Sequence, residues 1–184
     1  MNIGLIVLVV AVILIIMYVV SVYNSLVTLR NKVKDQWAQI DVYLKRRFDL
    51  IPNLVETVKG YAKHESDTLE SVIQARNSYV TASTNEDKMK ASGEITNALN
   101  KLFALSESYP DLKANTNFMS LQNDLKDTED KISMARQFYN DSVLTYNNKV
   151  ESVPSNIVAN FAGFKKGEFF QIAESEKEAP KVKF

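Results

Sequence analysis

Seven charged residues fall on or beside the apolar stripes of predicted helices, where a charge could do chemistry. They are Arg47, Asp49, Glu56, Glu65, Arg76, Glu129 and Arg136. A charge that faces a seam between helices is costly unless it is paired. Two interpretations stay open. The charges could form ion pairs that set the helix register, or they could line a polar pocket for a small ligand or a partner side chain.

No familiar catalytic or metal-binding pattern accompanies these charges. The chain has no cysteine and a single histidine, His64, which has no second histidine to share a metal ion. Carboxylates such as Glu56, Glu65 and Glu70 are common on helices, and the sequence lacks the Glu-x-x-His pairs of di-iron bundles. It also lacks a P-loop and a G-x-S-x-G motif. We therefore expect no enzymatic activity, no cofactor and no metal site.

The N-terminal segment predicts a membrane helix. Residues 1–29 contain no Lys, Arg, Asp or Glu, and Ile3–Val20 is an unbroken apolar run of 18 residues. At about 1.5 Å per residue, such a helix is about 27 Å long, close to the hydrocarbon thickness of a bilayer. A cleaved signal peptide is the alternative, but Met1–Asn2 offers no positive charge beyond the amine, and Ser21–Val22–Tyr23–Asn24–Ser25 is a poor cleavage site.

The distribution of basic residues predicts the orientation of this anchor. Arg30, Lys32 and Lys34 follow the apolar run, whereas the N-terminal tail has no Lys or Arg. The positive-inside rule then places the N-terminus outside and the rest of the chain in the cytoplasm. The basic trio Lys45–Arg46–Arg47 is interpreted as a solvated helix end, with binding to anionic lipid as the alternative.

Four apolar stripes with helical spacing follow the anchor. They run over 26–51, 54–79, 89–105 and 118–150, with apolar residues every three or four positions. Pro52 is predicted to end the first helix, with Asp49 as the cap of the next. The third helix should begin at a Thr84–Asp87 cap and end near Tyr109, and 111–117 should form a polar loop.

The predicted fold class is therefore all-α, with an N-terminal transmembrane helix followed by a four-helix up-and-down antiparallel bundle. The expected domains are an anchor at 1–23, a bundle at 24–153 and a C-terminal hook with a charged tail at 154–184. Within the second helix, Asp67 and Glu70 could form a capping box. Ile157, Phe161 and Phe164 suit a short amphipathic helix against one end of the bundle.

Several strings along nearly the whole chain resemble the LemA family. The most distinctive is Arg46–Arg47–Phe48–Asp49–Leu50–Ile51–Pro52–Asn53–Leu54–Val55. The others include Trp37–Ala38–Gln39–Ile40–Asp41, Val58–Lys59–Gly60–Tyr61, His64–Glu65, Tyr109–Pro110, Ala135–Arg136, Tyr139–Asn140 and Tyr146–Asn147. Val153–Pro154 departs from the family, which usually has an aromatic residue before the proline. The resemblance implies a bacterial, membrane-anchored four-helix bundle without established catalytic activity, and some relatives are tied to the organisation of membrane organelles.

These observations predict a membrane-anchored helical scaffold or protein-interaction module. Its expected partners are the lipid bilayer and an unidentified protein. Lys plus Arg and Asp plus Glu are both 22, so the chain has no basic surplus for nucleic acid. The sequence leaves homo-oligomer formation open, since Gly4 and Ala11 do not form a G-x-x-x-G face. The alternative function is a membrane-tethered sensor that binds a small ligand through the seam charges.

Overall fold

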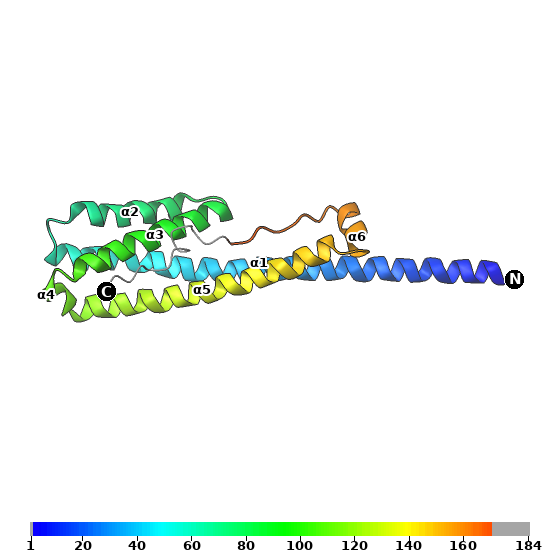
Figure 1. The fold of residues 1–184 in the computed structure, drawn as a ribbon, viewed down its shortest axis with the longest axis horizontal. Coiled ribbons are helices and arrows are strands. Elements are labelled where there is room, and N and C mark those ends of the chain that lie inside the picture. The colour runs from blue at the N-terminus through cyan, green and yellow to red at the C-terminus, as the bar shows by residue number, and fades with distance from the viewer. Residues whose placement is uncertain (1, 171–184) are drawn as a thin grey trace, which may run out of the picture. The chain divides into compact units, whose positions relative to one another are not determined.

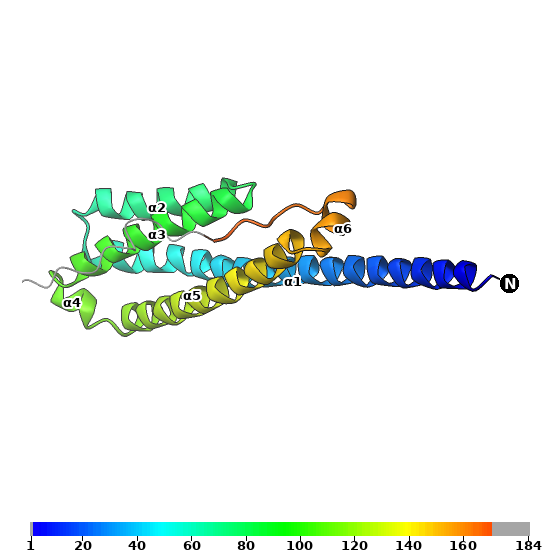
Figure 2. The same cartoon turned by 45° about the vertical axis from the view of Figure 1, so that its right-hand side comes forward.

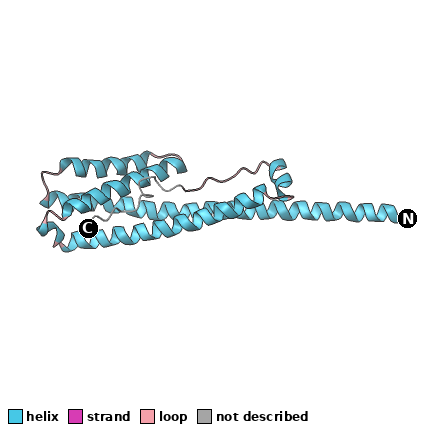
Figure 3. Cartoon of the chain, in the orientation of Figure 1, coloured by secondary structure: helices cyan, strands magenta, loops and turns pink. Residues whose placement is uncertain are grey.

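The computed structural model describes residues 2–170, and regular structure within that range is entirely helical (Figure 3). The predicted all-α class is therefore confirmed. The helices, labelled in Figure 1, are α1 (Ile3–Tyr61), α2 (Ser66–Thr81), α3 (Asn85–Ser106), α4 (Pro110–Lys113), α5 (Thr116–Glu151) and α6 (Ser155–Phe161). The predicted charged tail from Glu174 onward lies outside the described residues.

Helix α1 begins with the predicted apolar run. Every side chain from Gly4 to Ser21 is exposed, and an 18-residue window of this helix has a mean hydropathy of 3.4. Among the described helices, α1 is the one long and apolar enough to cross a bilayer, judged by length and composition. The structure is thus compatible with the predicted anchor.

The predicted break at Pro52 is wrong, because α1 continues through this proline to Tyr61. Asp49 is consequently inside a helix and caps nothing. A proline in a helix interior removes one hydrogen bond to the carbonyl four residues earlier. Here that carbonyl belongs to Phe48, and it accepts a hydrogen bond from Arg76 Nε of α2 at 3.4 Å. This contact from outside the helix helps α1 to accommodate the proline.

The predicted start of α3 is confirmed, whereas the capping box predicted for Asp67 and Glu70 is wrong. The Thr84 side chain accepts a hydrogen bond from the Asp87 backbone N–H at 3.1 Å, which satisfies one free donor of the first turn. In contrast, α2 begins at Ser66, and its N-cap Glu65 makes no side-chain capping hydrogen bond. Asp67 therefore lies in the first turn of α2, where a carboxylate favours the helix dipole.

The connection between α3 and α5 also differs from the prediction. Helix α3 ends at Ser106 instead of near Tyr109, and the expected polar loop contains the short helix α4. Pro110 occupies the first turn of α4, where a missing N–H costs nothing. Asn115 then accepts a hydrogen bond from the Phe118 backbone N–H at 2.9 Å. Local capping chemistry thus creates a turn of helix where composition predicted a loop.

The described chain forms two compact units. One contains the residues up to Gln39 together with Ala135–Phe169, and the other contains Ile40–Met134 and Phe170. Helices α1 and α5 each contribute to both units. The domain boundaries predicted after residues 23 and 153 stay predictions.

In the Ile40–Met134 unit, α2 and α3 lie side by side (Figures 1 and 2). The buried apolar residues come from the predicted stripes of four helical segments. They include Ile40, Leu44, Ile51 and Leu54 of α1, Val72 of α2, Ile95 and Leu102 of α3, and Phe118 and Ile132 of α5. These side chains form the hydrophobic core of this unit.

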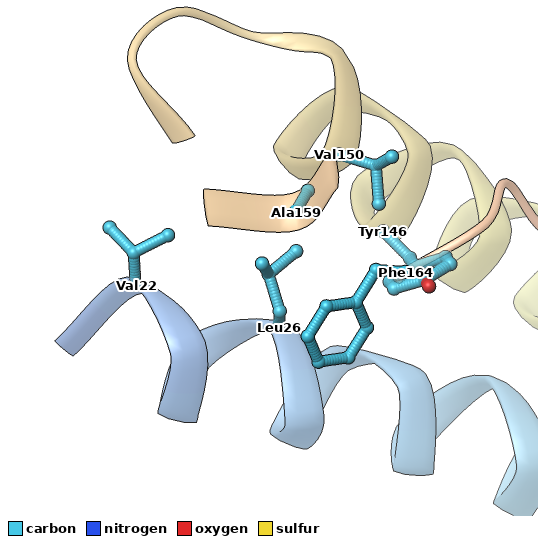
Figure 4. Packing of buried hydrophobic residues seen from close by; sticks show 6 residues of the cluster. All are labelled: Val22, Leu26, Tyr146, Val150, Ala159 and Phe164. Atoms are coloured by element: carbon cyan, nitrogen blue, oxygen red, sulfur yellow. The ribbon is translucent and has the colours of Figure 1, made fainter. Parts of the chain in front are cut away.

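In the other unit, the predicted hook is a helix, α6. Its Ala159 packs with Val22 and Leu26 of α1 and with Tyr146 and Val150 of α5 (Figure 4). Phe164, which follows α6, belongs to the same cluster. The cluster starts two residues after the exposed apolar run ends at Val20.

Candidate functional site: the charged helix seam

The most deeply buried of the predicted charges is Arg47, in the core of the Ile40–Met134 unit. Its side chain is only 3% exposed, and Nη1 lies 2.7 Å from Glu129 Oε2 of α5. Nη2 also donates a hydrogen bond to Thr96 Oγ1 of α3 at 3.0 Å. Arg47 therefore connects three helices. The charge of a buried arginine requires such partners, since removing either member of a buried pair is costly.

Arg76 performs a different task from the one that a ligand pocket would need. Its Nε donates a hydrogen bond to the Phe48 carbonyl. This carbonyl has no donor within α1, because residue 52 is proline and lacks an N–H. The contact is long, at 3.4 Å, and we assign it a modest energy. The arginine predicted from its place in an apolar stripe thus supports the backbone of a neighbouring helix.

A second polar network, absent from the sequence predictions, joins α1, α2 and α3. The Asp41 carboxylate accepts a hydrogen bond from the Tyr79 hydroxyl and another from Lys88 Nζ, each at 2.8 Å. The Tyr79 ring stacks on Phe48, with centroids 3.9 Å apart and planes inclined by 16°. Asp41 lies 38 residues before Tyr79 and 47 residues before Lys88, so local spacing carries no signal for the network.

This environment shifts the pKa values of Asp41 and Tyr79. Partial burial by itself raises the pKa of Asp41, but the hydrogen bonds from Lys88 and Tyr79 and the charges of Lys88 and Lys45 outweigh it. The pKa of Asp41 therefore lies below its ordinary value of 3.8. Burial, followed by the hydrogen bond to Asp41, raises the pKa of Tyr79 far above 10. Tyr79 is consequently a fixed hydrogen-bond donor at neutral pH.

The remaining predicted charges have different surroundings. Glu65 accepts a hydrogen bond from the Tyr109 hydroxyl at 2.9 Å, which raises the pKa of Tyr109. Glu56 is exposed and pairs with Lys59 one turn later. Asp49 is exposed, and Arg136 is half-buried on α5 in the other unit. Within the Ile40–Met134 unit, the structure therefore unites Arg47 with Glu129, whereas Glu65 and Glu56 have other partners.

An open groove lies in the unit that contains α6. Its lining is Lys32, Gln36 and Gln39 of α1 with Phe138, Asp141, Ser142 and Thr145 of α5. Phe138 is 53% exposed, although it is a large apolar side chain at the edge of polar groups. Aromatic residues are enriched in protein–protein interfaces, and the rims of such interfaces are polar.

A chain segment after α6 is held along α5 in the same unit. The Tyr146 hydroxyl donates to the Lys165 carbonyl at 2.8 Å, and the Tyr139 hydroxyl donates to the Glu168 carbonyl at 2.9 Å. Asn147 exchanges two hydrogen bonds with the backbone of Gly167. Burial raises the pKa of both tyrosines. Tyr139 and Tyr146, which belong to the predicted stripe over 118–150, thus fix the segment 165–168 together with Asn147.

The geometry contains little that would support metal or acid–base chemistry. Within residues 2–170, no group of three or more His, Asp or Glu side chains is placed to hold a metal ion. The buried Arg47 pairs with Glu129, and the half-buried Arg76 contacts a backbone carbonyl. The described residues therefore define a helical protein with one apolar N-terminal helix and a buried ion pair between α1 and α5.

Comparison with known proteins identifies the family of this chain. The model of the LemA family matches residues 36–184, and the chain belongs to the LemA family. It is 28% identical over 175 residues to magnetosome protein MamQ 2 of Paramagnetospirillum magneticum, with 81% of this chain and 64% of that protein covered. The chain thus spans less than two thirds of the length of this relative.

Two further relatives give the same picture. Magnetosome protein MamQ of Magnetospirillum gryphiswaldense is 28% identical over 174 residues, covering 80% of this chain and 64% of the relative. Protein LemA of Metamycoplasma hominis is 27% identical over 158 residues, covering 84% of this chain and 71% of the relative. The predicted resemblance to the LemA family is therefore confirmed.

The role of Arg76 is testable with a double-mutant cycle. Arg76→Met should lower the free energy of unfolding by about 1 kcal/mol, because the Phe48 carbonyl loses its donor. Pro52→Ala restores an N–H four residues after Phe48, so Arg76→Met should cost clearly less in the Pro52→Ala background. Urea unfolding of the full-length protein in detergent, followed by circular dichroism, measures the cycle. If Arg76→Met lowers the free energy of unfolding equally in both backgrounds, Arg76 does not compensate for Pro52 and the assigned role is wrong.

The Asp41 network predicts a pH-dependent contribution to stability. Because the folded pKa is depressed, this contribution is present above pH 3.8 and is lost as the pH falls through the folded pKa. Asp41→Asn should therefore cost about 1 kcal/mol at neutral pH, a value reduced by partial solvent exposure. The gap from the parent should narrow progressively as the pH falls below 3.8. Urea unfolding across this range tests it, with exposed Asp127→Asn as the control; a gap independent of pH would refute the assignment.

Proposed function

We propose that this protein is a non-enzymatic, membrane-anchored scaffold or protein-interaction module. The apolar start of α1 crosses the membrane, and the helical segments after it form a four-helix up-and-down antiparallel bundle in the cytoplasm. The observation that carries the proposal is the exposure of every side chain from Gly4 to Ser21, nearly all of them apolar. Apolar surface of this extent requires cover, and a bilayer of about 30 Å matches its length.

The composition around this segment supports the anchor. In lipid, backbone polar groups must be satisfied within the segment, and a helix does this for the β-branched run of Ile and Val. Tyr18 and Tyr23 lie near its end, where aromatic residues favour the membrane–water interface. Arg30, Lys32 and Lys34 follow on the same helix and favour a cytoplasmic location for the remainder of the chain.

The groove beside Phe138 supports an interaction role. It combines an exposed aromatic ring with amide, carboxylate and ammonium groups, and aromatic residues are enriched in protein interfaces. The seam charges favour this role over the alternative of a small-ligand sensor, since Arg47 and Arg76 already contact protein groups. The names of the MamQ relatives link those proteins to magnetosomes. For this chain we propose the broader role of organising proteins at a membrane.

The proposed orientation predicts the reactivity of an engineered thiol. The chain has no cysteine, so Ser83→Cys introduces a single thiol at an exposed position between α2 and α3. In intact cells, a membrane-impermeant maleimide should leave Ser83→Cys unlabelled, and permeabilisation should make it reactive. Asn2→Cys, at the other end of the anchor, is the matched control and should react in intact cells. The reverse pattern would place the bundle outside.

The proposed interaction role predicts a site-specific cross-link. A photoreactive phenylalanine analogue at position 138 should give a reproducible adduct of one size in native membranes, because the ring faces an open groove. The same analogue at Val80, an exposed apolar residue of α2, is the matched control and should give no such adduct. Mass spectrometry distinguishes another protein from a second copy of this chain. If the two positions give the same products, the groove has no specific partner.

A further inference from the structure

Helix α6 and the residue pair that precedes it expose an unusual amount of apolar surface. Val153 is 80% exposed, Ile157 is 67% exposed and Phe161 is 96% exposed. Ile157 and Phe161 are four residues apart, so they share one face of the helix. Ser155 and Ala159 are buried on the opposite face. This short helix is therefore amphipathic: Ala159 and, in part, Val158 are covered by protein, whereas Ile157 and Phe161 are open.

The height of α6 along α1 determines what lies next to this open surface. Ala159 packs with Val22 and Leu26 of α1 (Figure 4), and the exposed apolar run of α1 ends at Val20. Val22 is about 3 Å further along the helix axis than Val20, at 1.5 Å per residue. If the run lies in the hydrocarbon, α6 lies beside its boundary, within the headgroup layer of one leaflet.

Several interactions hold α6 in this position. The turn after the helix has Gly163 at φ 73°, and the Phe164 N–H bonds to the Ala159 carbonyl at 2.9 Å, which closes a Schellman motif. Phe164 packs edge-on against Tyr23 with centroids 5.6 Å apart. The Ser155 hydroxyl donates to the Lys149 carbonyl at 2.7 Å. The exposed side chains consequently cannot turn into the core without breaking these contacts.

Basic residues surround the same place. The Arg30 guanidinium lies 5.1 Å from the centre of the Phe164 ring, and Lys165 and Lys166 follow directly in the chain. Lys165 and Lys166 are both exposed, and Lys166 pairs with Glu151. Cations at this level would meet lipid phosphates, which attract Lys and Arg near a membrane surface. Apolar side chains with basic neighbours are typical of helices that lie in the interface.

We propose that α6 is an interfacial helix, which lies in the headgroup–acyl boundary of the bilayer with Ile157 and Phe161 in contact with lipid. The inference rests on the proposed anchor, because α1 sets the depth of α6. It adds a second membrane contact from a segment more than 130 residues further along the chain. The apolar side chains that α6 exposes are then covered by lipid, and the helix resists tilting of α1 at this boundary.

The test uses the full-length chain in vesicles of phosphatidylcholine with one part in four of phosphatidylglycerol. Single thiols are introduced by Phe161→Cys and Ile157→Cys and labelled with the environment-sensitive fluorophore NBD. Lipids that carry a nitroxide high on the acyl chain quench NBD only on contact. We expect blue-shifted emission and strong quenching for both variants. Val80→Cys, which is also an exposed apolar position but lies on α2, is the matched control and should be neither shifted nor quenched.

Flotation of the same vesicles separates this inference from the anchor. If the protein floats and Phe161→Cys is quenched no more than Val80→Cys, the contact of α6 with lipid is refuted and the anchor stands. A blue shift at Phe161→Cys without lipid quenching would mean that protein, for example a second copy of the chain, covers α6. This result also refutes the lipid contact of α6. If the protein does not float, the proposed anchor and the proposed lipid contact of α6 both fail.

Discussion

The structure depends on how the apolar surface of one helix is covered. Between Gly4 and Ser21, α1 exposes its side chains on every face, and from Val22 onward one face packs against protein. Burial of apolar surface is the dominant favourable term in folding, so the uncovered part requires another apolar phase. The covered part of α1 packs against apolar side chains of α5 and α6 and against Phe164. The change occurs within two residues of the end of the apolar run.

Buried polar groups are consistent with a structural role for the seam. Arg47 contacts Glu129 and Thr96, Arg76 serves the carbonyl left free by Pro52, and Asp41 joins Tyr79 to Lys88. Each contact links different helices, and each satisfies a group that would otherwise be costly to bury. Arg76 on α2 thus compensates for the hydrogen bond that Pro52 removes from α1, although 24 residues separate the two.

The sequence was sufficient for the features that depend on hydrophobic patterning or on the N-cap at Thr84. The stripe from Phe118 to Val150 predicted α5, the Thr84–Asp87 cap predicted the start of α3, and the apolar run predicted the start of α1. It failed at Pro52, because the compensating donor comes from another helix and leaves no local trace. It also failed at Pro110, whose place in the first turn of α4 depends on capping geometry. The Asp41 network was missed because its members meet only through tertiary packing.

The candidate site was predicted unevenly for a similar reason. A position on or beside an apolar stripe identified Arg47 and Arg76 as buried or half-buried residues, since helical phase determines which face a residue occupies. Phase does not determine the partner. Glu129 lies beside Arg47, whereas Glu56 points to solvent and pairs with Lys59. The same pattern therefore selected residues with quite different surroundings.

The central claim is that α1 passes from lipid into protein cover at Val22. A scan of single nitroxide-labelled cysteines from 10 to 34, in the full chain in lipid nanodiscs, tests it most directly. The account predicts uniform contact with dissolved oxygen up to residue 20, which reports lipid on all faces. Beyond Val22 it predicts protection that repeats with the helical period of 3.6 residues, together with access of a polar quencher on the other face. Periodic protection before residue 20, or access of the polar quencher there, would contradict the claim.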